Sequence, residues 1–512
     1  MAKFGIFSTY KVMVQRPGRS VAPEHRCRVN GRMCTLPAVP VNAGESFEQA
    51  TRIYRKLVDF YIAVFLDRWE KDFADCKTNN DYYNRLREIT TATASHPNPP
   101  FDVTRIAGEV ITEFRSAAGA EALGDVKSYL SLMENHRKNP KGCQAPGLPR
   151  AGRTYPTIYA TAFRFTPEIT VKVGGKDVTI RNKALIKSIV NGQWRWVELN
   201  LRKTDMVYIA RHCGMSEQKC PTLRRRHRFW YLDFGFADKV EIPKKDPATQ
   251  TILAVQMGIS CAATVVAMSP DGTILGRRFL HLRKFEDKLT RAFGRQNHAR
   301  RMSTSFGKRG FRMPRLNAFT EGINARISVL TAEFIMQAAR DFNADTVVFG
   351  KIDKSGKKLH PKQRLHMWRA CYVQEMVEHK AHKELKRLSR VNLDNTKHLA
   401  FDGSGKTDPI PTDPPEYVKV KVKNKETGKW EFVKRHMNST SHIKFTTGKI
   451  YSTELNAAYN IGARFFVREI FKDLKSRQQR AVAAQVPESE HRSQVTLNSL
   501  RRMSQILRTE TP

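Results

Sequence analysis

The sequence predicts an α/β domain combined with one α module and one β module. Three observations predict this fold class, and each concerns the order of apolar patterns along the chain. A helical block comes first, at 46–140, and a group of short strands follows, at 159–236. Next come three strands at 251–260, 261–270 and 273–282, a helix at 317–341 and a strand at 345–353. With 512 residues, the chain is long enough for about three domains with their own cores.

The α/β domain is predicted from its first three strands. The run TILAVQMGIS leads into CAATVVAMSP, and Asp271 and Gly272 connect the latter to TILGRRFLHL. An Asp-Gly pair between alternating apolar runs is a strong hairpin signal. A helical stretch then leads to DTVVFGKID, which we place beside the first strand. Three antiparallel strands, a helix and a strand beside the first are the order of an RNase H-like domain.

The chain has a large excess of positive charge. It contains 89 Lys and Arg against 49 Asp and Glu, which leaves a net charge of +40. Such a field is neutralised best by a polyanion, so nucleic acid is the expected partner. A membrane surface is the alternative, but the sequence shows no apolar run of about 18 residues and no signal-peptide core. We expect a bacterial cytoplasmic protein that is nucleoid-associated when bound.

The eight cysteines include no C-x-x-C pair, so the sequence predicts neither a disulfide framework nor a zinc ribbon. Reduced thiols are expected. His212, Cys213, Cys220 and His227 lie near one another but at irregular spacing. A zinc site there is an alternative to buried thiols and solvated histidines.

The first part of the chain is predicted as a strand at 4–15, loops with a short second strand up to about residue 45, and then helices. Ser46 is a candidate N-cap because Gln49 occupies the capping-box position and an apolar stripe with helical spacing follows. Further helices are predicted at about 80–93, 102–117 and 122–137. A linker rich in Pro, Gly and basic residues begins at Asn139.

Short strands follow this linker, and we predict that they form a small β-barrel with the N-terminal strand. The predicted strands are 159–175, 177–182, 193–202, 206–213 and 228–236. Aromatic residues alternate along them, namely Trp194, Trp196, Trp230 and Tyr231. Most are expected in the barrel core, and one or two that face outward could stack on RNA bases.

Two basic stretches are candidate nucleic-acid contacts. Arg224, Arg225, Arg226 and Arg228 precede and begin the last of these strands, and we interpret them as a phosphate clamp because Arg binds phosphate through two parallel hydrogen bonds. The second stretch, 282–315, spaces its cations along a helix and a turn. Its candidates are Arg283, Lys284, Arg291, Arg295, Arg300, Arg301, Lys308, Arg309, Arg312 and Arg315. Positive charges this close together repel one another unless a polyanion binds them, so we interpret the stretch as a nucleic-acid contact. The alternative interpretation is a helix face exposed to solvent.

The remaining chain is predicted to complete the α/β domain. A helix at 361–388 begins with a proline suited to a first turn. An insert at about 405–445 has the pattern of a β-hairpin, and LNAAYNIGARFFVREIFKDL is the final helix on the sheet. The tail, 476–512, is polar and basic; we predict part helix, at about 493–508, and part disorder.

These motifs resemble the split RuvC nuclease domain of transposon-encoded TnpB proteins and type V CRISPR–Cas effectors. The matching segments are AVQMGIS with its AATVVAMSPDG hairpin, VVFGK, FDGSG, FTTGKIY and ELNAAYNIGARFFVREI. The resemblance implies a RuvC-like domain at 248–475, a wedge β-barrel at 1–45 and 141–247, and a helical recognition lobe at 46–140 inserted in that wedge. It also implies a guide RNA, a target double-stranded DNA with a short flanking motif, and DNA cutting.

Three positions depart from the family pattern. Where the family has two Asp and one Glu, this sequence has Gln256, Gly350 and Glu454. Two-metal hydrolysis needs anionic oxygens that hold two Mg²⁺ ions about 4 Å apart, which a Gln amide and a Gly do not supply. We therefore expect no catalytic residue and no functional Mg²⁺ site. Asp353, three residues after Gly350, is a candidate replacement ligand, and a loop residue flanked by Lys351 and Lys354 is the alternative interpretation.

The leading hypothesis is RNA-guided binding of double-stranded DNA without cleavage, acting by target occlusion, transcriptional silencing or recruitment of a partner protein. Heteroduplex formation roughly balances the DNA duplex that it replaces, so binding requires no carboxylate. An active RuvC-type endonuclease with a rearranged metal site is one alternative. A guide-free nucleic-acid-binding protein is the other. Guide RNA is an expected obligate partner, and no other cofactor is expected.

Overall fold

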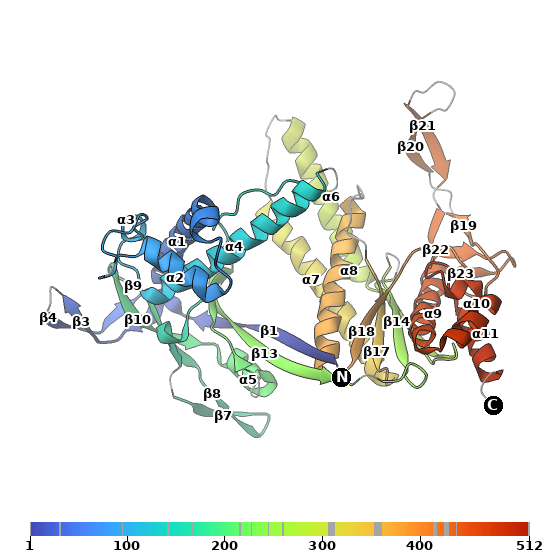
Figure 1. Ribbon diagram of the computed structural model, residues 1–512, viewed down its shortest axis with the longest axis horizontal. Helices are drawn as coiled ribbons and strands as arrows, with labels where there is room; N and C mark the ends of the chain where they lie inside the picture. The colour runs from blue at the N-terminus through green and yellow to red at the C-terminus, as the bar shows by residue number, and fades with distance from the viewer. Residues whose placement is uncertain are drawn as a thin grey trace. The chain divides into compact units, whose positions relative to one another are not determined.

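The computed structural model divides the chain into two compact units: Phe7–Asp238 forms one, and Met1–Ile6 with Lys239–Pro512 forms the other. We call them the N-terminal unit and the C-terminal unit and describe each by itself (Figure 1). The structure describes residues 2–29, 32–94, 96–140, 144–165, 167–213, 217–226, 228–243, 245–258, 261–305, 313–352, 361–412, 417–423, 430–436 and 438–509.

The N-terminal unit contains most of a nine-stranded sheet with the order β11-β13-β1-β10-β2-β5, in which β12 pairs with β13, β9 with β10 and β6 with β9. Its strands are β1 (Ala2–Gln15), β2 (Ser20–Ala22), β5 (Val39–Val41), β6 (Phe163–Phe165), β9 (Lys183–Val190), β10 (Gln193–Leu201), β11 (Glu217–Gln218), β12 (Thr222–Arg226) and β13 (Phe229–Ile242). The strand predicted at 4–15 is therefore confirmed, whereas β9 was not predicted.

The predicted closed barrel is not seen. Among the described residues, only one isolated bridge, Thr157 with Thr222, links β12 to the segment that leads into β6. That segment contains Pro156, which has no backbone N–H and contributes only its carbonyl, to Leu223 N at 2.9 Å. A ladder cannot continue through such a position, so the sheet remains open there.

The helices of this unit are α1 (Ala43–Asp72), α2 (Asn79–Thr90), α3 (Thr104–Ala107) and α4 (Thr112–Lys138). The predicted N-cap at Ser46 was wrong: Asn42 caps α1, with its Oδ1 accepting from Gly44 N, and the buried Ser46 hydroxyl donates to Ser188 Oγ at 2.7 Å. The predicted break near residue 120 was also wrong, because small buried residues of α4 pack continuously against α1.

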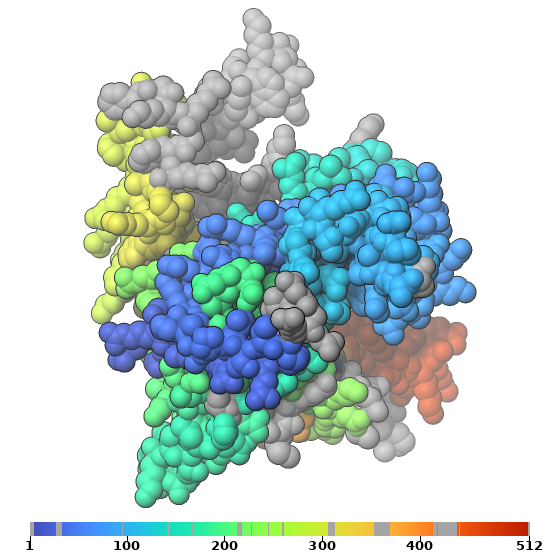
Figure 2. Space-filling model, turned by 90° about the vertical axis from the view of Figure 1, so that its left-hand side faces the viewer, coloured from blue at the N-terminus to red at the C-terminus, as the bar shows by residue number. Residues whose placement is uncertain are grey.

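The predicted strand at 206–213 was wrong as well, since these residues lie in helix α5 (Lys203–Cys213). Met206 and Ile209 are both buried at helical spacing, and Asp205 in the first turn accepts a hydrogen bond from Met13 N. Two hairpins complete the unit: β3 (His25–Val29) with β4 (Arg32–Leu36), and β7 (Ile169–Val173) with β8 (Lys176–Ile180). The β7–β8 hairpin protrudes from the surface of the unit (Figure 2).

The C-terminal unit contains a five-stranded sheet with the order β16-β15-β14-β17-β18. These strands are β14 (Ile252–Gln256), β15 (Ala263–Met268), β16 (Ile274–Leu280), β17 (Thr346–Gly350) and β18 (Arg387–Val391). The first three are antiparallel, and β17 runs parallel to β14 and β18. The strand order predicted for an RNase H-like sheet is thereby confirmed, with the hairpin turning at Gly272, whose φ of 80° favours glycine.

Helices cover both faces of this sheet (Figure 1). Ile252 and Ala254 of β14 pack toward α9 (Thr453–Asp473), whereas Leu253 and Val255 pack in the core that includes α7 (Pro314–Asp341) and α8 (Pro361–Lys383). The period of two along the strand explains this division. Helix α6 (Arg283–Ser305) packs against α7.

The insert contains the β20–β21 hairpin (Tyr417–Lys423 and Trp430–His436) and a sheet of β19 (Asp408–Pro411), β22 (Asn438–Lys444) and β23 (Ile450–Ser452). The tail forms α10 (Ser476–Gln485) and α11 (Leu497–Thr509), so much of the region predicted as partly disordered is folded. Leu497, Leu500 and Met503 are buried in the α9 core, which provides the apolar contact that orders the tail. Among the described residues, no helix is long and apolar enough to span a membrane.

Candidate functional site

The three positions that depart from the family pattern come together at one end of the five-stranded sheet. Gln256 ends β14 and Gly350 ends β17, and the parallel register pairs the residues just before them, Val255 with Phe349. Glu454 lies in the first turn of α9, and its Oε1 lies 1.5 Å from the point where a Cβ on Gly258 would be. Ligands of α/β proteins often bind at the carboxyl ends of strands.

Gln256 occupies its position as a satisfied, neutral side chain. It is buried, and its Nε2 donates to the carbonyl of Met257 at 2.8 Å. The amide is therefore held by its own backbone neighbour. It adds no negative charge to this end of the sheet.

Gly350 leaves no space for a side chain. A Cβ at this residue would lie 2.1 Å from Cδ2 and 2.2 Å from Cγ of Leu393. Leu393, in the loop after β18, packs with the α9 core. The Gly350 carbonyl accepts from Gln374 Nε2 at 3.0 Å. Leu393 was not among the sequence candidates, because nothing in its local pattern links it to a strand more than forty residues away.

Glu454 is the one carboxylate among the three positions. It is buried at the positive end of α9, where the helix dipole favours an anion, and Ser452 caps this helix. Burial, together with the charge of Glu454, raises the pKa of the nearby Cys261 thiol. Within the described ranges, no group of three or more His, Cys, Asp and Glu could hold a metal ion. A single carboxylate does not fit a pair of Mg²⁺ ions, and Asp353 lies outside the described residues.

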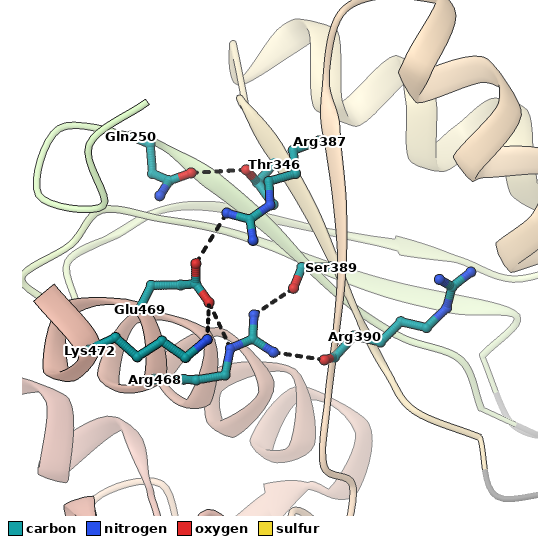
Figure 3. Close-up of polar contacts among 8 residues, drawn as sticks. All are labelled: Gln250, Thr346, Arg387, Ser389, Arg390, Arg468, Glu469 and Lys472. Atoms are coloured by element: carbon teal, nitrogen blue, oxygen red, sulfur yellow. Dashed lines mark hydrogen bonds and ion pairs between the residues drawn. The ribbon is translucent and has the colours of Figure 1, made fainter. Parts of the chain in front are cut away.

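A second cluster of charged side chains lies between β18 and the C-terminal half of α9, as Figure 3 shows. It includes Arg387, which pairs with Thr346 at the end of the sheet opposite Gly350. Arg387 of β18 donates to Glu469 Oε2 at 3.1 Å, and Arg468 donates to Glu469 Oε1 at 2.8 Å. Burial alone would raise the pKa of Glu469, but Arg468 and Arg387 outweigh it and lower the pKa. Lys472 lies 3.7 Å from the same carboxylate. One acidic group is therefore shared by three cations.

A cleft of about 1550 Å³ opens at the carboxyl ends of β14, β17 and β18. Its lining contains few acids and many cations: Lys351, Arg390, Lys397, Arg464, Arg468, Lys472 and Arg492 against Asp394 and Glu490. Arg464 has a structural role, because its guanidinium donates to the carbonyls of Asn392, Asp394, Ser493 and Val495 and so ties two loops to α9. Burial lowers the pKa of Arg464 to about 10.

The predicted phosphate clamp is divided between two faces of β12. Arg224 and Arg226 lie on one face, 3.5 and 2.7 Å from the buried carboxylate of Asp233. Arg225 points to the other face, where it pairs with Glu48. Successive residues of a strand point to opposite faces of the sheet, so the three consecutive arginines cannot all bind the same phosphate.

Arg228 lies one residue before β13, with its guanidinium 5.0 Å from the centre of the Phe229 ring. Trp230 is buried, as predicted for the core. Three of the four zinc candidates fall outside the described part of the chain: the side chains of His212 and Cys213, and all of His227.

The basic stretch at 282–315 is largely exposed. Arg283, Lys284, Arg291, Arg295, Arg300 and Arg301 are exposed on α6, and Arg315 is exposed at the start of α7. Lys308, Arg309 and Arg312 lie outside the described residues. No carboxylate of the described chain forms an ion pair with any of these seven exposed cations.

Four cations of α6 form a stripe, which we call the α6 stripe: Lys284, Lys288, Arg291 and Arg295. Their spacing of four, three and four residues places them on one helix face. The buried residues of the helix, Leu289, Ala292 and Gln296, lie on a different face. Lys288 was not among the sequence candidates, although the same helical spacing could have identified it.

Comparison with known proteins locates one sequence similarity in the N-terminal unit. A family model described as the Aq_aa04 family matches residues 35–174, which include α1 to α4. An uncharacterized protein of Aquifex aeolicus (strain VF5), aq_aa04, is 29% identical over 129 residues, which are 23% of this chain and 72% of that protein.

Among solved structures, the chain is similar to several nucleic-acid complexes of CRISPR effectors. A Cas12f1–sgRNA–target DNA complex has a TM-score of 0.45 at 12% identity, covering 77% of this chain and 91% of that chain. CasPhi-2 (Cas12j) bound to crRNA and phosphorothioate-DNA has a TM-score of 0.40 at 9% identity, covering 88% and 90%. AacC2c1 bound to sgRNA and extended non-target DNA has a TM-score of 0.39 at 9% identity, covering 86% and 66%.

Proposed function

We propose that the protein binds double-stranded DNA under the direction of a guide RNA and does not cut it. The observation that supports binding most directly is the α6 stripe, in which exposed cations repeat on one helix face without acidic partners among the described residues. Such a surface binds phosphates and releases condensed counterions. It contacts backbone rather than bases, which leaves sequence selection to the guide.

The absence of cutting is proposed from the three positions at the end of the sheet. A first-strand carboxylate is the ligand that bridges two metals, and Gln256 supplies a neutral amide already bonded to Met257. Leu393 fills the space beside Gly350, so a second carboxylate has no room there. Glu454 alone would leave both metal ions short of anionic ligands.

Guide RNA, a target duplex with a short flanking motif and a recruited partner protein are the proposed partners. The TnpB-like and type V motifs of the sequence favour them. AVQ of AVQMGIS ends β14, VVFG of VVFGK ends β17, and ELNAAYN lies in the first turns of α9. Bound without cutting, the protein would act by occlusion, silencing or recruitment.

The test uses the full chain purified from cells that carry its native genetic neighbourhood. RNA that copurifies is sequenced, and a duplex matching its guide segment is then incubated with the complex in Mg²⁺. Tight, guide-dependent binding with intact DNA is the expected result. Metal-dependent products that disappear in Glu454→Ala would instead establish the rearranged nuclease. Binding that ignores sequence and carries no discrete RNA would establish the guide-free binder.

A further inference from the structure

The outward face of the strands β12, β13 and β1 in the N-terminal unit exposes a large aromatic ring in the middle of a strand. Phe7 of β1 is 61% exposed, although Phe is ordinarily one of the most buried residue types. The ring lies against Gly235 of β13, because a Cβ there would be only 2.7 Å from Phe7 Cζ. Gly235 thus allows the ring to approach the sheet closely while much of the ring remains accessible to solvent.

Cations gather on the same face. Arg224 and Arg226 of β12 both approach Oδ2 of Asp233, which is 5% exposed. Lys11 of β1 belongs to this group as well: burial, and then the charge of Arg226, lowers its pKa, while Asp233 opposes the shift. Glu121 also acts on Arg224, so three cations face two carboxylates and leave an excess of positive charge.

Phe7 and Lys11 lie on the same side of β1, and Arg224 and Arg226 lie on β12, which pairs with β13. Exposed residues of β1 alternate with buried ones, so Phe7, Thr9 and Lys11 face outward while Ser8 and Val12 face the core. Lys11 is four positions after Phe7 along the strand, a distance of about 13 Å. Tyr155 adds a second ring, 5.7 Å from the Arg224 guanidinium.

We propose that this face binds an unpaired stretch of nucleic acid, in which Phe7 stacks on a base while Lys11, Arg224 and Arg226 contact phosphates. A flat ring accepts the face of any base, and the uncompensated cations complement a phosphodiester backbone. The inference rests on the nucleic-acid partner of the proposed function and adds the single-stranded site. Guide RNA and displaced DNA share this chemistry.

The test measures binding of the full-length chain to labelled single-stranded RNA and single-stranded DNA of the same mixed sequence. Phe7→Ala is expected to weaken binding roughly five- to hundredfold, the range found for one stacked base, and Phe7→Trp to retain it. Gly235→Ala should weaken binding too, because its Cβ displaces the ring, and should add little to Phe7→Ala. Phe319→Ala is the matched control, since that ring is 52% exposed on α7.

Salt dependence separates the two components of the site. Lys11→Ala with Arg224→Ala should lower the slope of log affinity against log salt by roughly 0.7 for each phosphate that is no longer neutralised, whereas Phe7→Ala should leave the slope unchanged. Stronger Phe7-dependent binding of RNA assigns the site to the guide, and stronger binding of DNA assigns it to the displaced strand. Single-strand affinity that is unchanged by Phe7→Ala in both arms overturns the inference.

The inference and the proposed function can fail separately. Guide-directed duplex binding that persists while Phe7→Ala has no effect on single strands rejects only the single-stranded site. Phe7-dependent binding of single strands without any guide-directed binding rejects only the proposed function. Light-induced crosslinking of an iodinated oligonucleotide, mapped by mass spectrometry, is expected at Phe7 and would be absent if the ring does not stack.

Discussion

Leu393 fills the space into which a side chain at residue 350 would extend, with its Cδ2 2.1 Å from the Cβ position of Gly350. The loop after β18 thus packs against the end of β17, where the resembled nucleases hold a carboxylate. The proposed lack of a metal ligand at residue 350 therefore rests on packing as well as on residue type.

This packing predicts the effect of adding a side chain. Gly350→Ala should lower the free energy of unfolding by about 1–3 kcal/mol, because overpacking forces Leu393 from its position. Leu393→Ala should relieve the overlap, so the double variant should lose less than the sum of the single variants. Urea unfolding of the four proteins measures this coupling. Additive losses would show that the two residues do not compete for space.

The α6 stripe predicts a specific salt dependence of DNA binding. Replacing Lys284, Lys288, Arg291 and Arg295 by Ala should weaken duplex binding and lower the salt slope by about 0.9 for each phosphate that is no longer neutralised. Sequence preference should not change, because cations that bind phosphates do not read bases. Filter binding over a range of salt concentrations measures both quantities.

A control with the same change in charge is available for the stripe. Arg85, Arg105, Arg137 and Lys138 are exposed, and each faces a carboxylate within 4.0 Å. Their replacement by Ala should reduce the salt slope less than the stripe variant does. Equal reductions would mean that binding follows total charge and not the α6 surface.

Asp271 predicts a pH dependence of stability in the C-terminal unit. Hydrogen bonds, first from the Ser269 hydroxyl and then from Thr273 and Arg508, lower the pKa of this carboxyl to about 2. A lowered folded-state pKa adds stability above the unfolded pKa, near 4, and this stability is lost as the pH falls through about 2. Because the side chain is 34% exposed, we expect a contribution of no more than about 1 kcal/mol.

The measurement compares the wild type with Asp271→Asn in urea between pH 5 and pH 2. The two proteins should differ most at pH 5 and converge toward pH 2 as the carboxyl becomes protonated. A difference that stays constant over this range would indicate that the charge of Asp271 does not contribute.

Because α11 of the tail packs on α9, shortening a buried side chain of α11 should lower the free energy of unfolding. Leu500 of α11 is fully buried in the α9 core, so Leu500→Ala should cost about 2–5 kcal/mol of unfolding free energy. Leu275→Ala is the control in the same unit, because that side chain is 51% exposed and should change stability by less than about 0.5 kcal/mol. Equal effects of the two substitutions would contradict the docking of α11 on α9.

The local sequence pattern was sufficient to predict the strands that are buried on both faces. The apolar runs of β14 and β15 and the Asp271-Gly272 turn predicted the sheet and its strand order, because a strand with both faces covered reads as a continuous apolar run. Local pattern was not sufficient at 206–213, where apolar residues fit a strand and a helix equally well.

The sequence by itself determined that this is a basic protein with an RNase H-like strand order and without the acidic residues of its resembled family at Gln256 and Gly350. Only the tertiary structure decided that Leu393 occupies the space beside Gly350, that Arg224 and Arg225 face opposite ways, and that the tail is part of a core. Residue type and period are properties of a local window, whereas filled space and shared charge depend on residues brought together from distant parts of the chain.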